Sequence, residues 1–163
     1  MTMTMTMNKI DEAIQLSRHG DFLQAFSRFL DIYGTENSPP LNNPKAAAGL
    51  SYFGLCMALV QKKYRPAIEL CRRALDLEFY NGDHYVNLAR VYLAAGQRKK
   101  ALDIAESGLR LLPDHDDLLR VRRSLGVRSR PPVPFLNRSH PINVSLGQAR
   151  HAKKSSEQEK RKK

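Results

Sequence analysis

The stretch NLARVYLAAGQRKKAL, residues 87–102, decides the fold of this chain. It places small residues at Ala89, Gly96 and Ala101 among larger apolar and basic ones. Where two antiparallel helices cross, their backbones approach so closely that only Ala or Gly fits on one side, while a bulky side chain fills the space opposite. We expect Ala89 and Ala101 to be such crossing points, and Gly96 to end the first helix with positive φ.

The same pattern recurs at an interval of 34 residues. Segment 64–81 aligns with segment 98–115, which pairs Ala67 with Ala101 and Leu75 with Leu109. Further upstream, residues 20–33 show the same order, and Ala25 precedes Ala67 by 34 residues plus eight that fall in the Pro- and Asn-rich stretch TENSPPLNNP. A fixed period of this length predicts a repeat architecture in which each unit buries its apolar face against the next.

These residues resemble the tetratricopeptide repeat family. The third repeat carries that family's large, small, aromatic and proline positions nearly complete, although Ala105 stands where a bulky residue is usual; the matching residues are Tyr85, Leu88, Ala89, Tyr92, Ala101 and Pro113. The second repeat needs one extra residue near 61–63 and has Phe79 in place of the closing proline; it matches through Leu50, Phe53, Gly54, Met57, Tyr64, Ala67, Cys71 and Ala74. The first is weaker, with Lys9 and Glu12 at apolar positions; it matches through Ala13, Leu16, Gly20, Phe22, Ala25 and Phe29.

The resemblance implies an all-α fold, a right-handed α-solenoid of three helix-turn-helix repeats with a C-terminal capping helix and an extended basic tail. We expect a disordered start at 1–7, a repeat domain at 8–126, a Pro-containing extended segment at 127–149 and a disordered basic tail at 150–163. Within the domain, the expected repeats are 8–36, 46–80 and 82–114, followed by a cap at 115–126. Asp114 is the expected N-cap of that last helix, Leu118, Leu119 and Leu125 its apolar stripe, and Gly126 its end.

The uncharged run Ala46–Val60 is fifteen residues long, which is short of the roughly twenty that a membrane span needs. A helix in the middle repeat has neighbours on both sides, so burial explains this run without lipid. Cys56 and Cys71 have no CxxC spacing and no secretory leader is expected upstream. We interpret them as reduced, buried thiols of a cytoplasmic protein, the alternatives being a redox pair or a metal site.

The net charge of +11 is concentrated at one end of the sequence. Residues 1–119 hold fourteen Lys/Arg and fourteen Asp/Glu, whereas residues 120–163 hold thirteen Lys/Arg and two Asp/Glu. A basic tail on a neutral body predicts non-specific, salt-dependent attraction to RNA, DNA or an anionic membrane surface. The residues expected to bind such a polyanion are Arg150, Lys153, Lys154, Lys160, Arg161, Lys162 and Lys163.

Function is expected at the concave groove of the repeats, because members of the family act as scaffolds that bind a peptide or a partner helix there. By that resemblance the groove receives Ile10, Ile14, Ser17, Ser51, Leu55, Val86, Asn87, Arg90 and Leu93. One subgroup clamps the C-terminal carboxylate of chaperones with Lys, Asn and Arg, but Ile10 and Ile14 occupy the places of its Lys and Asn. A hydrophobic helix or extended segment is therefore the expected ligand. Alternatively, Arg90 has no role in binding and is only a solvent-exposed surface residue, or it forms an ion pair with Asp83 or Asp103.

Two alternatives to a protein-binding adaptor remain open. One is a polyanion-binding accessory protein that acts through its tail; the other, suggested by length and repeat count, is a small bacterial chaperone of the kind that escorts secretion translocators. The prolines and apolar residues of 130–146 predict either back-folding onto the stack or a docking motif. We expect neither an enzyme nor a bound cofactor or metal. His115 has acidic neighbours but no further ligands at a spacing that suits a metal ion. A nucleophile pair is imaginable for Cys71 with His84 or His115, but the repeat pattern places Cys71 at a buried position.

Overall fold

The computed structural model describes residues 3–34 and 43–126, together with positions 133, 141, 142, 144–146 and 149. The chain divides into two units, residues 1–126 and 127–163. Seven helices make up the first unit, and the residues described contain no strand. The helices are α1 (Met3–His19), α2 (Phe22–Tyr33), α3 (Pro44–Gln61), α4 (Tyr64–Leu77), α5 (Gly82–Ala94), α6 (Arg98–Leu111) and α7 (Asp116–Ser124).

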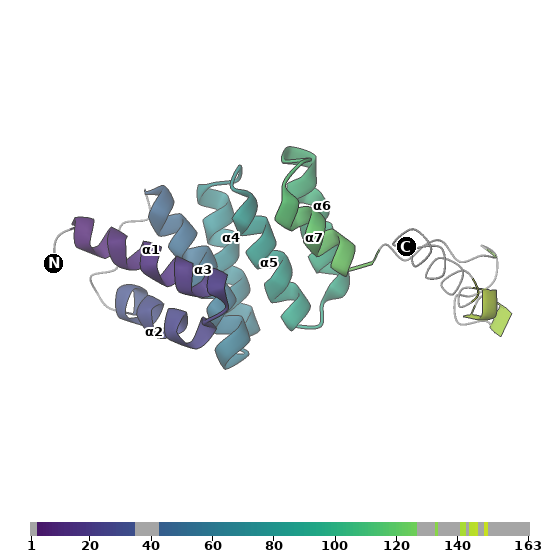
Figure 1. Ribbon diagram of the computed structural model, residues 1–163, viewed down its shortest axis with the longest axis horizontal. Helices are drawn as coiled ribbons and strands as arrows, with labels where there is room; N and C mark the ends of the chain where they lie inside the picture. The colour runs from purple at the N-terminus through teal and green to yellow at the C-terminus, as the bar shows by residue number, and fades with distance from the viewer. Residues whose placement is uncertain are drawn as a thin grey trace, which may run out of the picture. The chain divides into compact units, whose positions relative to one another are not determined.

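The first six helices pair into three hairpins that follow one another along the unit (Figure 1). α1 packs on α2, α3 on α4 and α5 on α6, and each hairpin contacts the next through α1–α3, α2–α3, α3–α5 and α4–α5. α7 lies against α5 and α6. The expected all-helical solenoid with a final single helix is confirmed.

Small residues sit at the helix crossings, as the sequence predicted. Ala89 and Ala101 are completely buried, and Gly96 has φ of 72° in the turn between α5 and α6. At Gly54 a Cβ atom would lie 2.7 Å from the Ala67 carbonyl oxygen and 2.8 Å from the Cys71 Sγ. The backbones of α3 and α4 are therefore so close that a methyl group does not fit between them.

Burial accounts for the uncharged run of α3. The helix contacts α1, α2, α4 and α5, and eleven of its eighteen residues are buried. Phe53 of α3 stacks on Phe26 and Tyr33 of α2 at centroid distances of 5.7 Å each, which joins the first repeat to the second. A helix enclosed on this many sides needs no polar face.

Helix starts and ends follow from local residues. Asn43 and Asn81 cap α3 and α5 by accepting hydrogen bonds from the backbone N–H of Lys45 (2.8 Å) and Asp83 (3.1 Å). Lys62 follows α3 with φ of 56°, inside the stretch where the sequence requires one extra residue. The helical register of the second repeat is thus adjusted at a left-handed turn.

The start of the chain departs from the prediction. Residues 3–7, expected to lie outside the fold, form the beginning of α1, and Met7 is buried in the core cluster that contains Ile10 and Phe29. Met7 lies one turn before Ile10 and extends the apolar face of the helix.

The capping helix also begins one residue later than expected. His115, not Asp114, is the N-cap of α7, and its Nδ1 accepts from the Leu118 N–H at 3.4 Å. Leu118 is completely buried and packs beside Gly108, where a Cβ would lie 2.8 Å from Leu118 Cδ1. Leu125 is buried in the cluster that contains Ala105, the position where the family usually has a bulky residue.

Candidate binding groove

The first helices of the repeats line a groove together with α7. This inner groove has a volume of about 780 Å³ and receives side chains from α1, α3, α5 and α7. Its lining residues are Ser17, Arg18, Tyr52, Asp83, Val86, Asn87, Arg90, Leu93, Asp117, Arg120, Val121 and Ser124.

One side of the inner groove is a closed polar triangle from three helices. Arg18 Nη2 lies 2.8 Å from Asp83 Oδ2 and Arg18 Nε donates to the Tyr52 hydroxyl at 3.0 Å, while that hydroxyl donates to Asp83 Oδ2 at 2.9 Å. The guanidinium carbon also lies 5.8 Å from the centroid of the Tyr52 ring. The triangle links α1, α3 and α5, and the charge of Arg18 is paired with Asp83 of the same chain.

Arg18 and Tyr52 both keep their protons at neutral pH. Hydrogen bonds to Tyr52 and Asp83 raise the pKa of Arg18 further above its usual range. Burial raises the pKa of Tyr52 to about 12, so its hydroxyl stays protonated and keeps donating to Asp83. We therefore interpret the triangle as support for the groove wall.

Arg90 differs from Arg18 in having no ion pair among the residues that the structure describes. Asp83, one of the partners considered for it, is bound by Arg18 instead. Arg90 is exposed, and the apolar side chains of Val86, Leu93 and Val121 line the same groove. A free cation beside an apolar strip can bind an acidic group and an apolar side chain of one ligand.

The structure divides the nine residues predicted for the groove into two groups. Ile10, Ile14, Ser51 and Leu55 lie in the interior, which corrects their placement on the binding surface. The others line the inner groove, namely Ser17, Val86, Asn87, Arg90 and Leu93. Ser17 and Asn87 are nevertheless almost fully buried and engaged, Ser17 with the Ala13 carbonyl and Asn87 with the Ser51 hydroxyl.

The reason for the correction is a rotation of the inner face. On α3 the groove side chain is Tyr52, one residue after the predicted Ser51, and one residue turns a helix by about 100°. On α1 the groove side chains are Ser17 and Arg18, one turn beyond the predicted Ile14. The side chains of Ile10, Ile14, Ser51 and Leu55 are instead buried in the packing between helices. The signal in the sequence that could have identified Arg18 and Tyr52 is a polar side chain directly beside the apolar stripe of each helix.

Sequence reasoning also missed the part that α7 plays. Asp117, Arg120, Val121 and Ser124 of α7 line the inner groove, and Arg120 Nη1 lies 3.2 Å from Asp117 Oδ1. The spacing of Asp117, Arg120 and Ser124 by three and four residues marks one helix face. The sequence pattern predicts this helix only as a cap.

The imagined nucleophile pair does not form. The Cys71 thiol is fully buried and bonds the Ser51 carbonyl at 3.4 Å, while His84 Nε2 lies 3.1 Å from Glu78 Oε2. Burial raises the pKa of Cys71 to about 12 and that of Cys56 to about 11. Both cysteines are free thiols.

The described residues contain neither a cluster of metal-ligating side chains nor a helix suited to span a membrane. No group of three or more His, Cys, Asp or Glu in the part that the structure describes is placed to hold a metal ion. Over the same ranges, no helix has the length and hydropathy required to cross a membrane. The predicted polyanion-binding residues from Arg150 to Lys163 lie outside the described residues.

Comparisons with known proteins agree with this geometry. Residues 58–125 match the model of the tetratricopeptide repeat family. Among solved structures, the chain is similar to the first TPR of Spaghetti (RPAP3), bound there to an HSP90 peptide, at 16% identity and a TM-score of 0.55 over 74% of this chain and 89% of that one. No curated protein matches the chain in sequence.

Two longer proteins share the fold. The Hsp90 co-chaperone Cns1 from Saccharomyces cerevisiae aligns at 16% identity and a TM-score of 0.58, over 98% of this chain and 45% of that one. The TPR domain of P58(IPK) aligns at 20% identity and 0.55, over 73% and 32%. The chain thus spans less than half of the length of these two. Residues 58–125 therefore match the tetratricopeptide repeat family in sequence, and the helical unit α1–α7 shares the fold of these tetratricopeptide repeat structures.

Proposed function

We propose that the protein is a protein-interaction adaptor that binds a peptide or partner helix in its inner groove. The observation that carries the proposal is the exposed Arg90, which has no ion pair among the described residues and stands in a groove that Val86, Leu93 and Val121 also line. A similar domain, the first TPR of Spaghetti, is bound to an HSP90 peptide in its solved structure.

The lining predicts the chemistry of the ligand. Arg18 and Arg120 are engaged by Asp83 and Asp117, so Arg90 is left to meet an acidic side chain or carboxylate. The apolar strip takes one or two aliphatic side chains on the same face of the ligand. This ligand is more polar than the one expected from the sequence, because Ile10, Ile14 and Leu55 are not available.

The test begins with peptides selected from a random displayed library on the immobilised full chain. A selected peptide is synthesised, and its Kd is measured for the wild type, Arg90→Glu and the control Arg73→Glu. Arg73 is also exposed but lies on α4, which does not line the inner groove. We expect Arg90→Glu to weaken binding at least about tenfold and Arg73→Glu to leave it unchanged.

A charge exchange makes the result specific. If an acidic residue of the peptide meets Arg90, its replacement by lysine restores binding to Arg90→Glu and weakens binding to the wild type. Equal affinities of wild type and Arg90→Glu for every selected peptide contradict the groove as the binding site.

The basic tail supports a second candidate function, binding of polyanions. The excess charge of +11 falls entirely within residues 120–163 of an otherwise neutral chain. Neutralising several phosphates releases counterions, so the affinity for a single-stranded RNA of random sequence falls steeply with salt. A chain truncated after His151 is expected to lose most of this binding at low salt; equal gel shifts of the two chains contradict it.

A further inference from the structure

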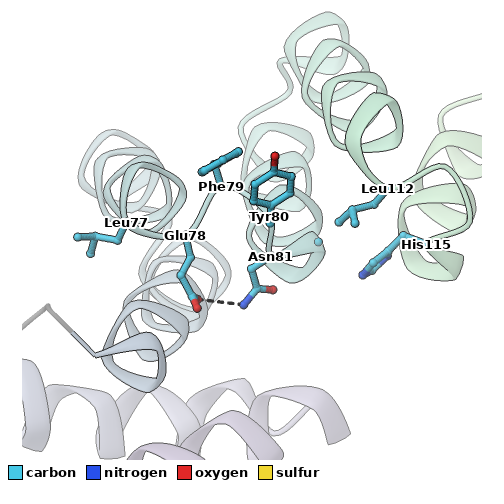
Figure 2. Close-up of a pocket in the computed structure, with 8 residues that line it drawn as sticks. Leu77, Glu78, Phe79, Tyr80, Asn81, Leu112 and His115 are labelled. Carbon is cyan, nitrogen blue, oxygen red and sulfur yellow. Dashed lines mark hydrogen bonds between the residues drawn. The ribbon is translucent and has the colours of Figure 1, made fainter.

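A second hollow lies away from the inner groove, between the turn that joins α4 to α5 and the turn that joins α6 to α7. This loop pocket has a volume of about 600 Å³ and is lined by Leu77, Glu78, Phe79, Tyr80, Asn81, Gly82, Leu112 and His115 (Figure 2). None of these residues lines the inner groove. The loop pocket is therefore a separate feature of the surface.

The loop pocket is surrounded by exposed apolar side chains. Phe79 is 52% exposed and Tyr80 65%, and their ring centroids are 3.9 Å apart. Leu77 and Leu111, at the ends of α4 and α6, are also more than two fifths exposed. Large apolar side chains exposed beside a pocket are a feature of surfaces where another molecule binds.

The walls of the loop pocket are held in place by the fold. Glu78 Oε2 lies 3.1 Å from Asn81 Nδ2, the bond drawn in Figure 2, and 3.1 Å from Nε2 of the buried His84. The His115 ring packs on Gly82 so closely that a Cβ there would overlap it. A preformed pocket loses little entropy when a ligand enters.

The surroundings of the loop pocket are acidic in a basic protein. Segments 75–84 and 110–117, which contain the lining residues, hold one arginine, Arg110, and six acidic residues, namely Asp76, Glu78, Asp83, Asp114, Asp116 and Asp117. Asp83 and Asp117 are paired in the inner groove. Asp76, Asp114 and Asp116 are exposed, and none of them has an ion pair within the part of the chain that the structure describes.

From these observations we propose that the loop pocket is a second docking surface, whose occupant is a basic segment of a partner protein with an apolar side chain at its centre. The apolar side chain enters between Tyr80 and the Leu112–His115 wall. Flanking Lys or Arg side chains face Asp76, Asp114 and Asp116, and the rings of Phe79 and Tyr80 offer a further surface for a cation. The charge of the rim selects the partner against acidic segments.

Three synthetic heptapeptides test the two parts of this recognition. The first has Pro-Phe-Leu between two lysines at each end, the second replaces all lysines by glutamates, and the third keeps the lysines around three glycines. Each is titrated into the full chain labelled with ¹⁵N. We expect the first to shift amide signals of residues 77–82 and 111–116, and to bind at least about tenfold more tightly than either of the others.

Matched variants locate the binding. The double variant Phe79→Ser/Tyr80→Ser removes the exposed rings without touching the core, and Leu23→Ser removes a 70% exposed side chain on α2 as its control. Asp114→Asn/Asp116→Asn lowers the charge of the rim, with Asp31→Asn on α2 as its control. Both test variants are expected to raise the Kd of the first peptide at least about fivefold while their amide spectra stay native. Both controls are expected to leave this Kd unchanged.

Other occupants of the loop pocket give distinguishable results. A nitroxide placed on Ser139→Cys of the full chain would broaden residues 77–82 if the protein's own tail occupied the surface, and sedimentation would show a dimer lost in Phe79→Ser/Tyr80→Ser if a second copy did. Either result overturns the partner proposal. Equal binding of the basic and acidic peptides, or shifts confined to residues 86–93, also overturns it.

Discussion

At the scale of single residues, this domain depends on positions where a side chain has to be small. Gly54 faces the Ala67 carbonyl, Gly108 faces Leu118 and Tyr85, and Ala101 is completely buried between larger neighbours. These positions recur with the repeat because each hairpin has the same crossing. That is why Ala67 and Ala101, 34 residues apart, were sufficient to predict the architecture.

Ala101→Leu tests the crossing of α5 and α6. Three additional carbon atoms have no space at a completely buried site, so we expect a loss of about 1–3 kcal/mol in the free energy of unfolding. The measurement is urea denaturation followed by circular dichroism. Lys99→Leu, on an exposed position of the same helix, is the control. Equal midpoints for Ala101→Leu and the wild type would show that the crossing lies elsewhere.

The two thiols make a second prediction at this scale. Burial raises the pKa of Cys56 to about 11, so about one molecule in a thousand carries the reactive thiolate at pH 8. We expect negligible alkylation by iodoacetamide in native buffer and complete alkylation in urea, read by mass spectrometry. Rapid native labelling of either cysteine contradicts the burial of these sites.

At the scale of elements, the junction between α4 and α5 depends on one buried histidine. His84 is fully buried, and because a carboxylate only accepts, its Nε2–H donates to Glu78. Its Nδ1 has no partner among the described residues. Protonation would bury a second N–H without an acceptor, and burial accordingly lowers the pKa of His84 although Glu78 favours the charged ring.

The lowered pKa of His84 makes the stability of the fold depend on pH. The unfolded chain binds the proton of this histidine near its ordinary pKa of about 6.5, whereas the folded chain binds it only at lower pH. The free energy of unfolding therefore falls as the pH is lowered from 7 to 5. His84→Gln keeps a donor for Glu78 without titrating, so its urea midpoint is expected to fall less over this range. Parallel curves for the two proteins would exclude His84 as the source.

The elements also show what sequence alone can and cannot give. Helix ends at Gly96 and Gly126 were predicted because positive φ favours glycine, and both have it. The groove was partly misassigned because the side chains that line it depend on the rotation of each helix. Ile10 and Leu55 have the hydrophobicity of a binding surface, but the same property places them in the core. Only packing distinguishes these two outcomes.

At the scale of the whole helical unit, stability is expected to be distributed along the stack. α3 and α5 each pack against four other helices, whereas α7 packs against α5 and α6 alone; α1 packs against α2 and α3 and reaches α5 through the Arg18–Asp83 pair. In a linear array each repeat is stabilised by its neighbours, so elements at the ends open at a lower free energy than those in the middle.

Native-state hydrogen exchange of the full chain, read by mass spectrometry, tests this distribution. We expect amides of α3 and α5, which each pack against four other helices, to exchange most slowly, and those of α7 and of residues 3–7 first, because protection follows the number of neighbours that must separate. Ala101→Leu is expected to accelerate exchange in α5, α6 and α7 more than in α1 and α2, since its strain lies in the last hairpin. Uniform acceleration over all seven helices would instead show that the unit opens as a single block.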